Sequence, residues 1–199
     1  MTDKKLIELF LKGDITAFNR LVWCWEKPLF NFVYRIVGNK ETTKDICQMT
    51  FIRMFKQLKK LRDPEKFSSW IYRIALNLCR DEFKKKRNNH IVYLDELLSD
   101  EESINSIGQL PDKNSKTPEE TYHQKQISEL LKRAILLLPE EQKVVLIMKQ
   151  YQGLKFTEIA EILKEPLSTI KSRLYYGLRS LRKILEESKL NEEALSNEL

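Results

Sequence analysis

"KEPLSTIKSRLYYGLRSLRKIL", residues 164–185, begins with a proline-containing turn and continues with small hydroxyl residues and with cations that no acid balances before Glu186. The preceding stretch "FTEIAEIL", residues 156–163, predicts a short helix. Pro166 suits the first turn of the next helix, because that turn needs no backbone N–H from it. Two short helices joined by a tight turn, the second of them polar and basic, are typical of a helix-turn-helix motif.

The helix predicted after Pro166 has two chemically different faces. The apolar face, expected to pack on the preceding helix, comprises Ile170, Leu174, Leu178 and Leu181. In a helix-turn-helix motif the second helix enters the DNA major groove with its N-terminal residues. The candidate DNA contacts are therefore Thr169, Lys171, Ser172, Arg173, Tyr175, Tyr176 and Arg179. The alternative interpretation of this stretch alone is a solvated basic helix.

A second basic segment lies much earlier in the chain. "RIALNLCRDEFKKKRNN", residues 73–89, carries six Lys or Arg side chains, and Phe67, Trp70 and Tyr72 lie just before or at its start. Cations interleaved with aromatic rings suit a nucleic acid whose bases are partly unstacked. Core aromatics beside a solvated charge run are the alternative, but two such basic helices in one chain favour DNA binding.

The composition excludes several classes of protein. The chain has 199 residues, a net charge of +6 and a hydrophobic fraction of 42%. No apolar run approaches the ~20 residues that span a bilayer, and "MTDKKLIELF" lacks the features of a signal peptide. We therefore expect a cytoplasmic protein. Cys24, Cys47 and Cys79 lack CxxC spacing and are expected to be small buried hydrophobes, with no metal site.

Helical periodicity dominates and predicts an all-α protein. Residues 1–88 predict a helical bundle, residues 89–120 a flexible acidic linker, residues 121–187 a second helical domain, and residues 188–199 a polar C-terminal tail. Within the bundle, helices are expected to end at Gly13 and Gly38, with Asp14 or Thr16 as a cap and a new helix starting at Pro28. Two buried stripes are predicted: Phe51, Met54, Phe55 and Leu58, and Ile71, Ile74, Ala75 and Leu78.

Three segments together resemble a known family. They are "DICQMTFIRMFKQL" (residues 45–58), "KFSSWIYRIALNLCRDEFKKKR" (66–87) and the stretch from "LPEEQKVV" to "LRSLRK" (138–183). In this order, around a polar linker, they are similar to regions 2.2, 2.3–2.4 and 4 of the extracytoplasmic-function sigma factors. These are small two-domain initiation subunits of bacterial RNA polymerase.

The resemblance implies three sets of site residues. The region 2.2 helix would dock on the coiled coil in the clamp of the largest subunit of core RNA polymerase, through Asp45, Gln48, Ile52, Arg53 and Lys56. The promoter −10 element would be bound by Trp70, Asn77, Arg80, Asp81, Lys84 and Arg87, and the loop at residues 59–67 would capture a flipped base. The −35 element would be read by the contacts named above on the last helix.

The resemblance also implies partners, and the chain departs from the family pattern at three positions. Core polymerase and promoter DNA are the expected partners, with an anti-sigma factor that is membrane-anchored in many family members. No catalytic residue, cofactor or small-molecule substrate is implied. Lys164 and Ser168 stand where glycine is common, and Tyr176 stands where arginine is frequent. Tyrosine cannot grip guanine in a bidentate way, so a different −35 preference is expected.

Two other classes of function fit less well. A DNA-binding regulator that acts without polymerase would leave the first basic helix unexplained, and the chain offers no coiled coil or ligand domain. An enzyme acting on nucleic acid would need a catalytic motif, but HExxH, Walker A and G-x-S-x-G patterns do not occur. The acidic linker is either a simple tether or a mimic of nucleic acid within polymerase.

Overall fold

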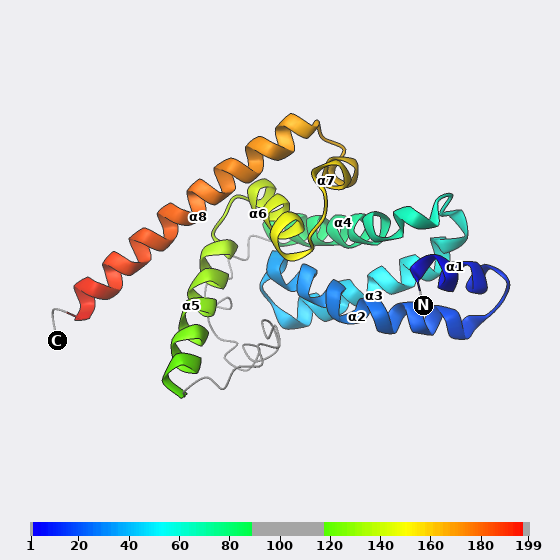
Figure 1. The fold of residues 1–199 in the computed structure, drawn as a ribbon, viewed down its shortest axis with the longest axis horizontal. Helices are drawn as coiled ribbons and strands as arrows, with labels where there is room; N and C mark the ends of the chain where they lie inside the picture. Colours follow the sequence, from blue (N-terminus) through cyan, green and yellow to red (C-terminus); the bar gives the residue numbers. More distant parts are fainter. Residues whose placement is uncertain (1, 89–117, 197–199) are drawn as a thin grey trace.

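Helices make up most of the described structure. The computed structural model describes residues 2–88 and 118–196 (Figure 1), and within these ranges every regular element is helical, as the sequence predicts. The first domain contains α1 (Asp3–Leu11), α2 (Ile15–Val37), α3 (Lys40–Gln57) and α4 (Phe67–Asn88), and the second contains α5 (Pro118–Leu136), α6 (Glu140–Leu146), α7 (Phe156–Leu163) and α8 (Leu167–Ser196). The short turns Leu58–Lys60 (η1), Pro64–Lys66 (η2) and Ile147–Tyr151 (η5) connect them. The predicted acidic linker lies outside the described residues, apart from the start of α5.

Local capping explains where the first helices begin and end. The Asp14 carboxylate accepts the backbone N–H groups of Thr16 at 2.9 Å and Ala17 at 3.4 Å, as expected of an N-cap residue. Gly13 and Gly38 both have a positive φ, of 101° and 76°. A residue without a Cβ adopts this left-handed backbone without strain, so both glycines lie where the chain leaves a helix.

Pro28 does not start a new helix, contrary to the prediction. It lies inside α2, which continues from Ile15 to Val37. A proline inside a helix removes one backbone hydrogen bond. The helix persists because Leu21, Leu29 and Phe32 on either side of Pro28 are fully buried, so packing against the other helices of the bundle offsets the loss.

The buried face of α3 also differs from the predicted stripe. Met54 and Leu58 are buried, but 46% of Phe55 is exposed, and its ring only borders Phe10 and Phe18. The core side of α3 instead includes Thr43 and Thr50, both fully buried. Each hydroxyl donates a 2.7 Å hydrogen bond to a carbonyl one turn earlier, that of Asn39 or Ile46. A threonine whose hydroxyl is satisfied in this way can be buried at little cost.

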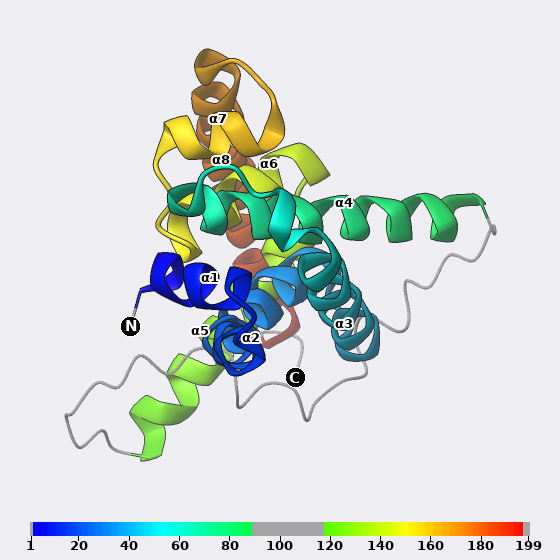
Figure 2. The same ribbon diagram turned by 90° about the vertical axis from the view of Figure 1, so that its right-hand side faces the viewer.

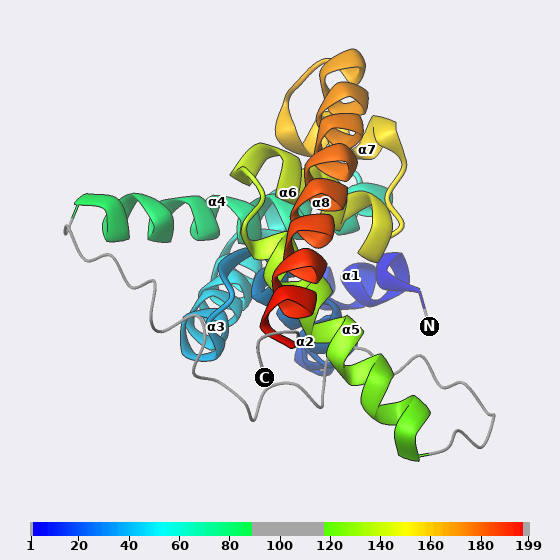
Figure 3. The same cartoon turned by 90° about the vertical axis from the view of Figure 1, so that its left-hand side faces the viewer.

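The second domain packs directly on the first. In Figures 1 and 2, α6 and α7 lie against α4, and α8 runs alongside α6 and α5 in Figure 3. The buried core is continuous across the two domains. The buried Tyr72 hydroxyl donates a 2.6 Å hydrogen bond to the Gln152 side chain, and the Arg35 guanidinium lies 4.2 Å from the centre of the Tyr151 ring. The last helix extends to Ser196, into the stretch expected to form a polar tail.

In the turn between α7 and α8, a residue other than glycine has a left-handed backbone conformation. Lys164, at the C-terminus of α7, has φ +57°. An L-residue with a side chain adopts this conformation at a cost of roughly 1 kcal/mol or more. Lys164 is exposed, so the cost is one of backbone strain and not of lost packing.

We predict that Lys164→Gly stabilises the protein by about 1 kcal/mol, because glycine adopts a positive φ without strain. Urea denaturation followed by circular dichroism measures the change. The matched control is Lys171→Gly, an exposed position inside α8, where the same substitution should cost about 1 kcal/mol. Equal loss of stability in both variants would contradict the strain at Lys164.

Candidate nucleic-acid and polymerase interfaces

The N-terminal half of α8 presents most of the predicted −35 contacts to solvent. Its exposed members are Lys171, Ser172, Tyr175, Tyr176 and Arg179, and Thr169 is half-buried. Tyr175 and Tyr176 are 64% and 53% exposed, and their rings meet edge to face with centroids 5.5 Å apart. Large exposed rings beside cations can contact both bases and phosphates, so this surface is suited to a DNA groove.

The side of α8 that faces the protein differs from the predicted one only at Leu178, because Leu181 also packs against the core as expected. Ile170 and Leu174 are buried as expected, but 44% of Leu178 is exposed. Gly177 takes the buried position instead, and a Cβ there would lie 3.3 Å from the Cβ of Gln142 on α6. The close approach of α6 at a residue without a side chain therefore sets which face of α8 is buried.

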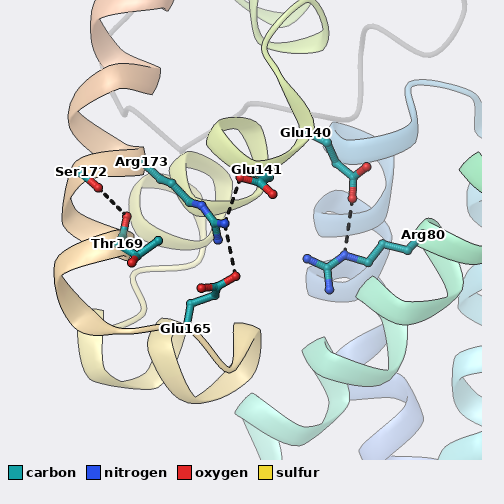
Figure 4. Close-up of polar contacts among 7 residues, drawn as sticks. All are labelled: Arg80, Glu140, Glu141, Glu165, Thr169, Ser172 and Arg173. Atoms are coloured by element: carbon teal, nitrogen blue, oxygen red, sulfur yellow. Dashed lines mark hydrogen bonds and ion pairs between the residues drawn. The ribbon is translucent and has the colours of Figure 1, made fainter.

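Arg173 points into the protein, although the sequence places it among the DNA contacts. Its side chain is only 18% exposed. One guanidinium nitrogen lies 2.9 Å from the Glu141 carboxylate and 3.2 Å from the Glu165 carboxylate (Figure 4). Arg173 thus ties α8 to the start of α6 and to the turn before α8, and these ion pairs leave it less accessible than the other predicted contacts.

The basic helix α4 is exposed along only part of its length. Asn77, Asp81, Lys84 and Arg87 are exposed, whereas Arg80 is half-buried with its Nε 3.4 Å from the Glu140 carboxylate (Figure 4). The last two cations of this group, Lys84 and Arg87, are therefore the most accessible to a phosphate.

Two of the three aromatic residues near the start of α4 are buried in the core. For these two, the alternative interpretation of core aromatics is favoured over stacking on nucleic-acid bases. Phe67 and Tyr72 are 1% and 4% exposed, and only Trp70 is half-buried. Burial raises the pKa of the Tyr72 phenol, so it stays protonated and donates to Gln152. Of the three rings, Trp70 alone has surface that a base could reach.

The predicted polymerase-binding residues lie on α3, on the side away from the core. Asp45, Gln48, Ile52 and Lys56 are exposed, and Arg53 is half-buried. Met49 and Phe55, which sequence reasoning did not assign to this face, are 43% and 46% exposed beside them. The signal was present in the sequence, since apolar residues at positions 49, 52 and 55 recur at helical spacing on an otherwise polar face. Apolar groups exposed in this pattern indicate a protein-binding surface.

Among the described residues, the cysteines and acids do not form a metal-binding or reactive site. Burial raises the pKa of the Cys47 thiol to about 12, and Cys79 is also buried with a raised pKa, so both stay neutral. Cys24 is exposed, contrary to the prediction. Within residues 2–88 and 118–196, no group of three or more His, Cys, Asp or Glu side chains could hold a metal ion. None of the described helices is both long and apolar enough to cross a membrane.

Comparisons with known proteins assign the chain to a family. The first domain matches the family model described as Sigma-70 region 2 over residues 21–89, and the second matches Sigma-70, region 4 over residues 128–181. The chain therefore belongs to the sigma-70 family, in its extracytoplasmic-function (ECF) group. Sigma factors of this kind are transcription initiation factors without enzymatic activity, and promoter-specific initiation is the function of this chain.

Individual relatives agree with this assignment. The chain is 33% identical over 187 residues to the ECF RNA polymerase sigma factor SigW of Bacillus subtilis, covering 94% of this chain and 98% of the relative. It is 29% identical over 175 residues to the ECF RNA polymerase sigma-E factor of Escherichia coli, covering 88% and 90% of the two chains. Both relatives are matched over almost their whole length.

Two solved structures share the fold. One is CnrH in complex with the cytosolic domain of CnrY, with a TM-score of 0.65, 19% identity, and coverage of 93% of this chain and 97% of that one. The other is the sigma factor RpoE in complex with the anti-sigma factor NepR from Bartonella quintana, with a TM-score of 0.62, 18% identity, and coverage of 85% and 96%. They extend the likeness from sequence to the arrangement of the helices.

We predict that Arg173→Ala destabilises the protein by about 1 kcal/mol, because it removes a mostly buried guanidinium that pairs with two carboxylates. Chemical denaturation measures this loss. Lys171→Ala, two residues earlier on the exposed side of α8, is the matched control and should leave stability nearly unchanged. A fully stable Arg173→Ala variant would show that the two ion pairs contribute little to stability.

Proposed function

We propose that the two basic helices divide promoter recognition between them, with α4 binding the −10 element and α8 reading the −35 element. The observation that carries this proposal is that α4 and α8 belong to different helical domains and that each exposes cations to solvent, Lys84 and Arg87 on α4 and Lys171 and Arg179 on α8. Phosphate contacts would supply salt-dependent affinity, and side chains directed at base edges would supply the choice of promoter.

On α8, the exposed side chains suggest a division of roles. Lys171 and Arg179 are suited to phosphates, while Ser172, Tyr175 and Tyr176 lie where base edges would be reached. The Ser172 hydroxyl donates to the Thr169 carbonyl at 3.0 Å, so its oxygen remains available to accept from a base. Arg173 positions the helix and makes no DNA contact in this assignment.

On α4, Asn77, Asp81, Lys84 and Arg87 form the accessible part of the −10 surface, with Trp70 and Arg80 at its edge. The loop before the helix, residues 59–67, would receive a flipped base. It is shaped by η1 and η2, and the Asp63 carboxylate accepts the Glu65 backbone N–H at 3.0 Å. Such a capped turn is a defined platform on which a base could be held.

The partners follow from the same surfaces. The exposed face of α3 would dock on the clamp of the largest polymerase subunit, with Ile52 and its apolar neighbours Met49 and Phe55 at the centre of the contact. The solved relatives described above include a sigma factor bound to an anti-sigma factor. We infer that an anti-sigma factor also regulates this chain, and that the chain acts in the cytoplasm, where RNA polymerase is found.

Transcription in vitro from a genomic promoter pool, with purified core polymerase in the presence and absence of the chain, tests the proposed function. New start sites should appear only with the chain.

In the same assay, Ile52→Glu should abolish both the start sites and binding to core, because a buried charge at an apolar contact is costly. Trp23→Glu, at a side chain 80% exposed on α2, is the matched control and should remain active. If the wild-type chain yields no start site and does not bind core, a free-standing DNA-binding regulator becomes the better reading.

We further predict that Tyr176→Arg changes the bases shared by the −35 elements of the recovered promoters. An arginine can form a bidentate contact with guanine, worth about 1–3 kcal/mol of discrimination, which tyrosine cannot form. The expected result is enrichment of guanine at one −35 position in the variant pool. An unchanged −35 pattern would remove Tyr176 from the set of base-reading residues. The control is Arg179→Ala, which should weaken transcription from all promoters about equally, because Arg179 is assigned to a phosphate.

A further inference from the structure

The first helix lies against the loop that is proposed to receive a flipped base. In Figure 1, α1 lies beside the turn that precedes α4, and it contacts η2 there. The Lys4 amine on α1 lies 3.0 Å from the Glu65 carboxylate on η2. The match to Sigma-70 region 2 begins at residue 21, beyond the end of α1. The contact between α1 and the loop is therefore a feature of this chain that the family model does not describe.

A second contact connects α1 to the end of the same loop. The indole Nε1 of Trp25 on α2 donates to the Asp3 carboxylate at 3.2 Å, and the Trp25 ring meets the Phe67 ring edge to face with centroids 5.5 Å apart. Phe67 is the first residue of α4 and is buried, so its position determines where the loop ends. A half-buried indole N–H needs an acceptor, and α1 supplies it.

Close packing does not fix the distance between α1 and η2. A cleft of about 240 Å³ lies between them, lined by Thr2, Asp3 and Lys4 on one side and by Pro64, Glu65 and Ser68 on the other. The Lys4–Glu65 ion pair joins the two sides of this cleft. The Asp63 carboxylate holds the backbone N–H of Glu65 at 3.0 Å, so Glu65 is held both within the loop and from α1.

We propose that α1 is a positioning element for base capture, which keeps the loop at residues 59–67 in the shape that receives a flipped base. Lys4 acts by holding Glu65. Asp3 acts by holding Trp25, whose ring packs on Phe67. A loop that is already in its binding conformation loses less conformational entropy on capturing a base than one that must first be ordered. This inference rests on the proposed role of the loop, and α1 itself needs no contact with DNA.

The effect of removing single bases from the −10 element tests the role of Lys4. Core polymerase with the full chain is bound to a fork-junction fragment of a recovered promoter, and each base of its single-stranded −10 element is replaced in turn by an abasic site. With the unmodified chain, the abasic site at the captured position should weaken binding about tenfold. Lys4→Glu repels Glu65 and should reduce this penalty to about threefold. The penalty is a ratio of two affinities of one variant, so a uniform effect of charge on DNA binding cancels.

Two further variants separate the ion pair from a general effect of charge. Exchanging the charges, with Lys4→Glu and Glu65→Lys together, should restore the tenfold penalty. The matched control is Lys5→Glu, whose partner Glu8 lies on α1 itself, and it should keep the tenfold penalty. An unchanged penalty in Lys4→Glu overturns the inference, and so does a charge exchange that fails to restore it. The absence of any penalty with the unmodified chain contradicts base capture itself, whereas a lack of start sites contradicts the proposed function as a whole.

A pair of variants tests the contact between Asp3 and Trp25. Asp3→Asn keeps a side-chain oxygen for the indole N–H and should keep the tenfold penalty, whereas Asp3→Ala removes the oxygen and should reduce the penalty. Affinity for core polymerase, which α3 is proposed to bind, should be the same in both variants. An unchanged penalty in Asp3→Ala overturns the role of Asp3. A loss of core binding that parallels the loss of the penalty would show general unfolding and would overturn it as well.

Discussion

Two neighbouring carboxylates at the start of α6 connect the two basic helices of this sigma factor. Glu140 pairs with Arg80 of α4, and Glu141 pairs with Arg173 of α8. Adjacent like charges repel, so each is favoured by its own cation, and these cations come from different helices. α6 is thereby a common support for the two helices that are proposed to bind DNA. The continuous apolar core beneath it holds the domains together in this arrangement.

The cations of the protein serve two opposing needs. A cation that binds DNA must be accessible, whereas a cation that stabilises the fold lies against a carboxylate. Helical geometry separates the two on α8, since residues two apart point roughly 200° from each other. Lys171 is exposed while Arg173 is 18% exposed and paired twice. On α4 the separation is lengthwise, with Arg73 and Arg80 against the second domain and Lys84 exposed beyond it.

Features set by a few consecutive residues could be predicted from the sequence. The helix-turn-helix segment, the cap at Asp14, the turn at Gly38 and the exposed face of α3 all follow from side-chain chemistry within one or two helical turns. The errors have a different origin. The sequence could not show that packing would carry α2 through Pro28 or that the hydroxyl of Thr50 would be satisfied inside the core. Both outcomes depend on neighbours that are distant in the chain or on hydrogen bonds formed only in the folded helix.

The sequence by itself determined the all-α class, the two basic helices and the family. Helical periodicity, charge runs and motif order depend only on the order of residues along the chain. Only the tertiary structure decided which side chains of those helices are free. Arg173 and Arg80 resemble DNA contacts in the sequence, but carboxylates on α6 and in the turn before α8 meet them in the fold. The availability of a cation depends on the acids that the fold brings to it, and Arg80 and Glu140 are separated by 60 positions in the chain.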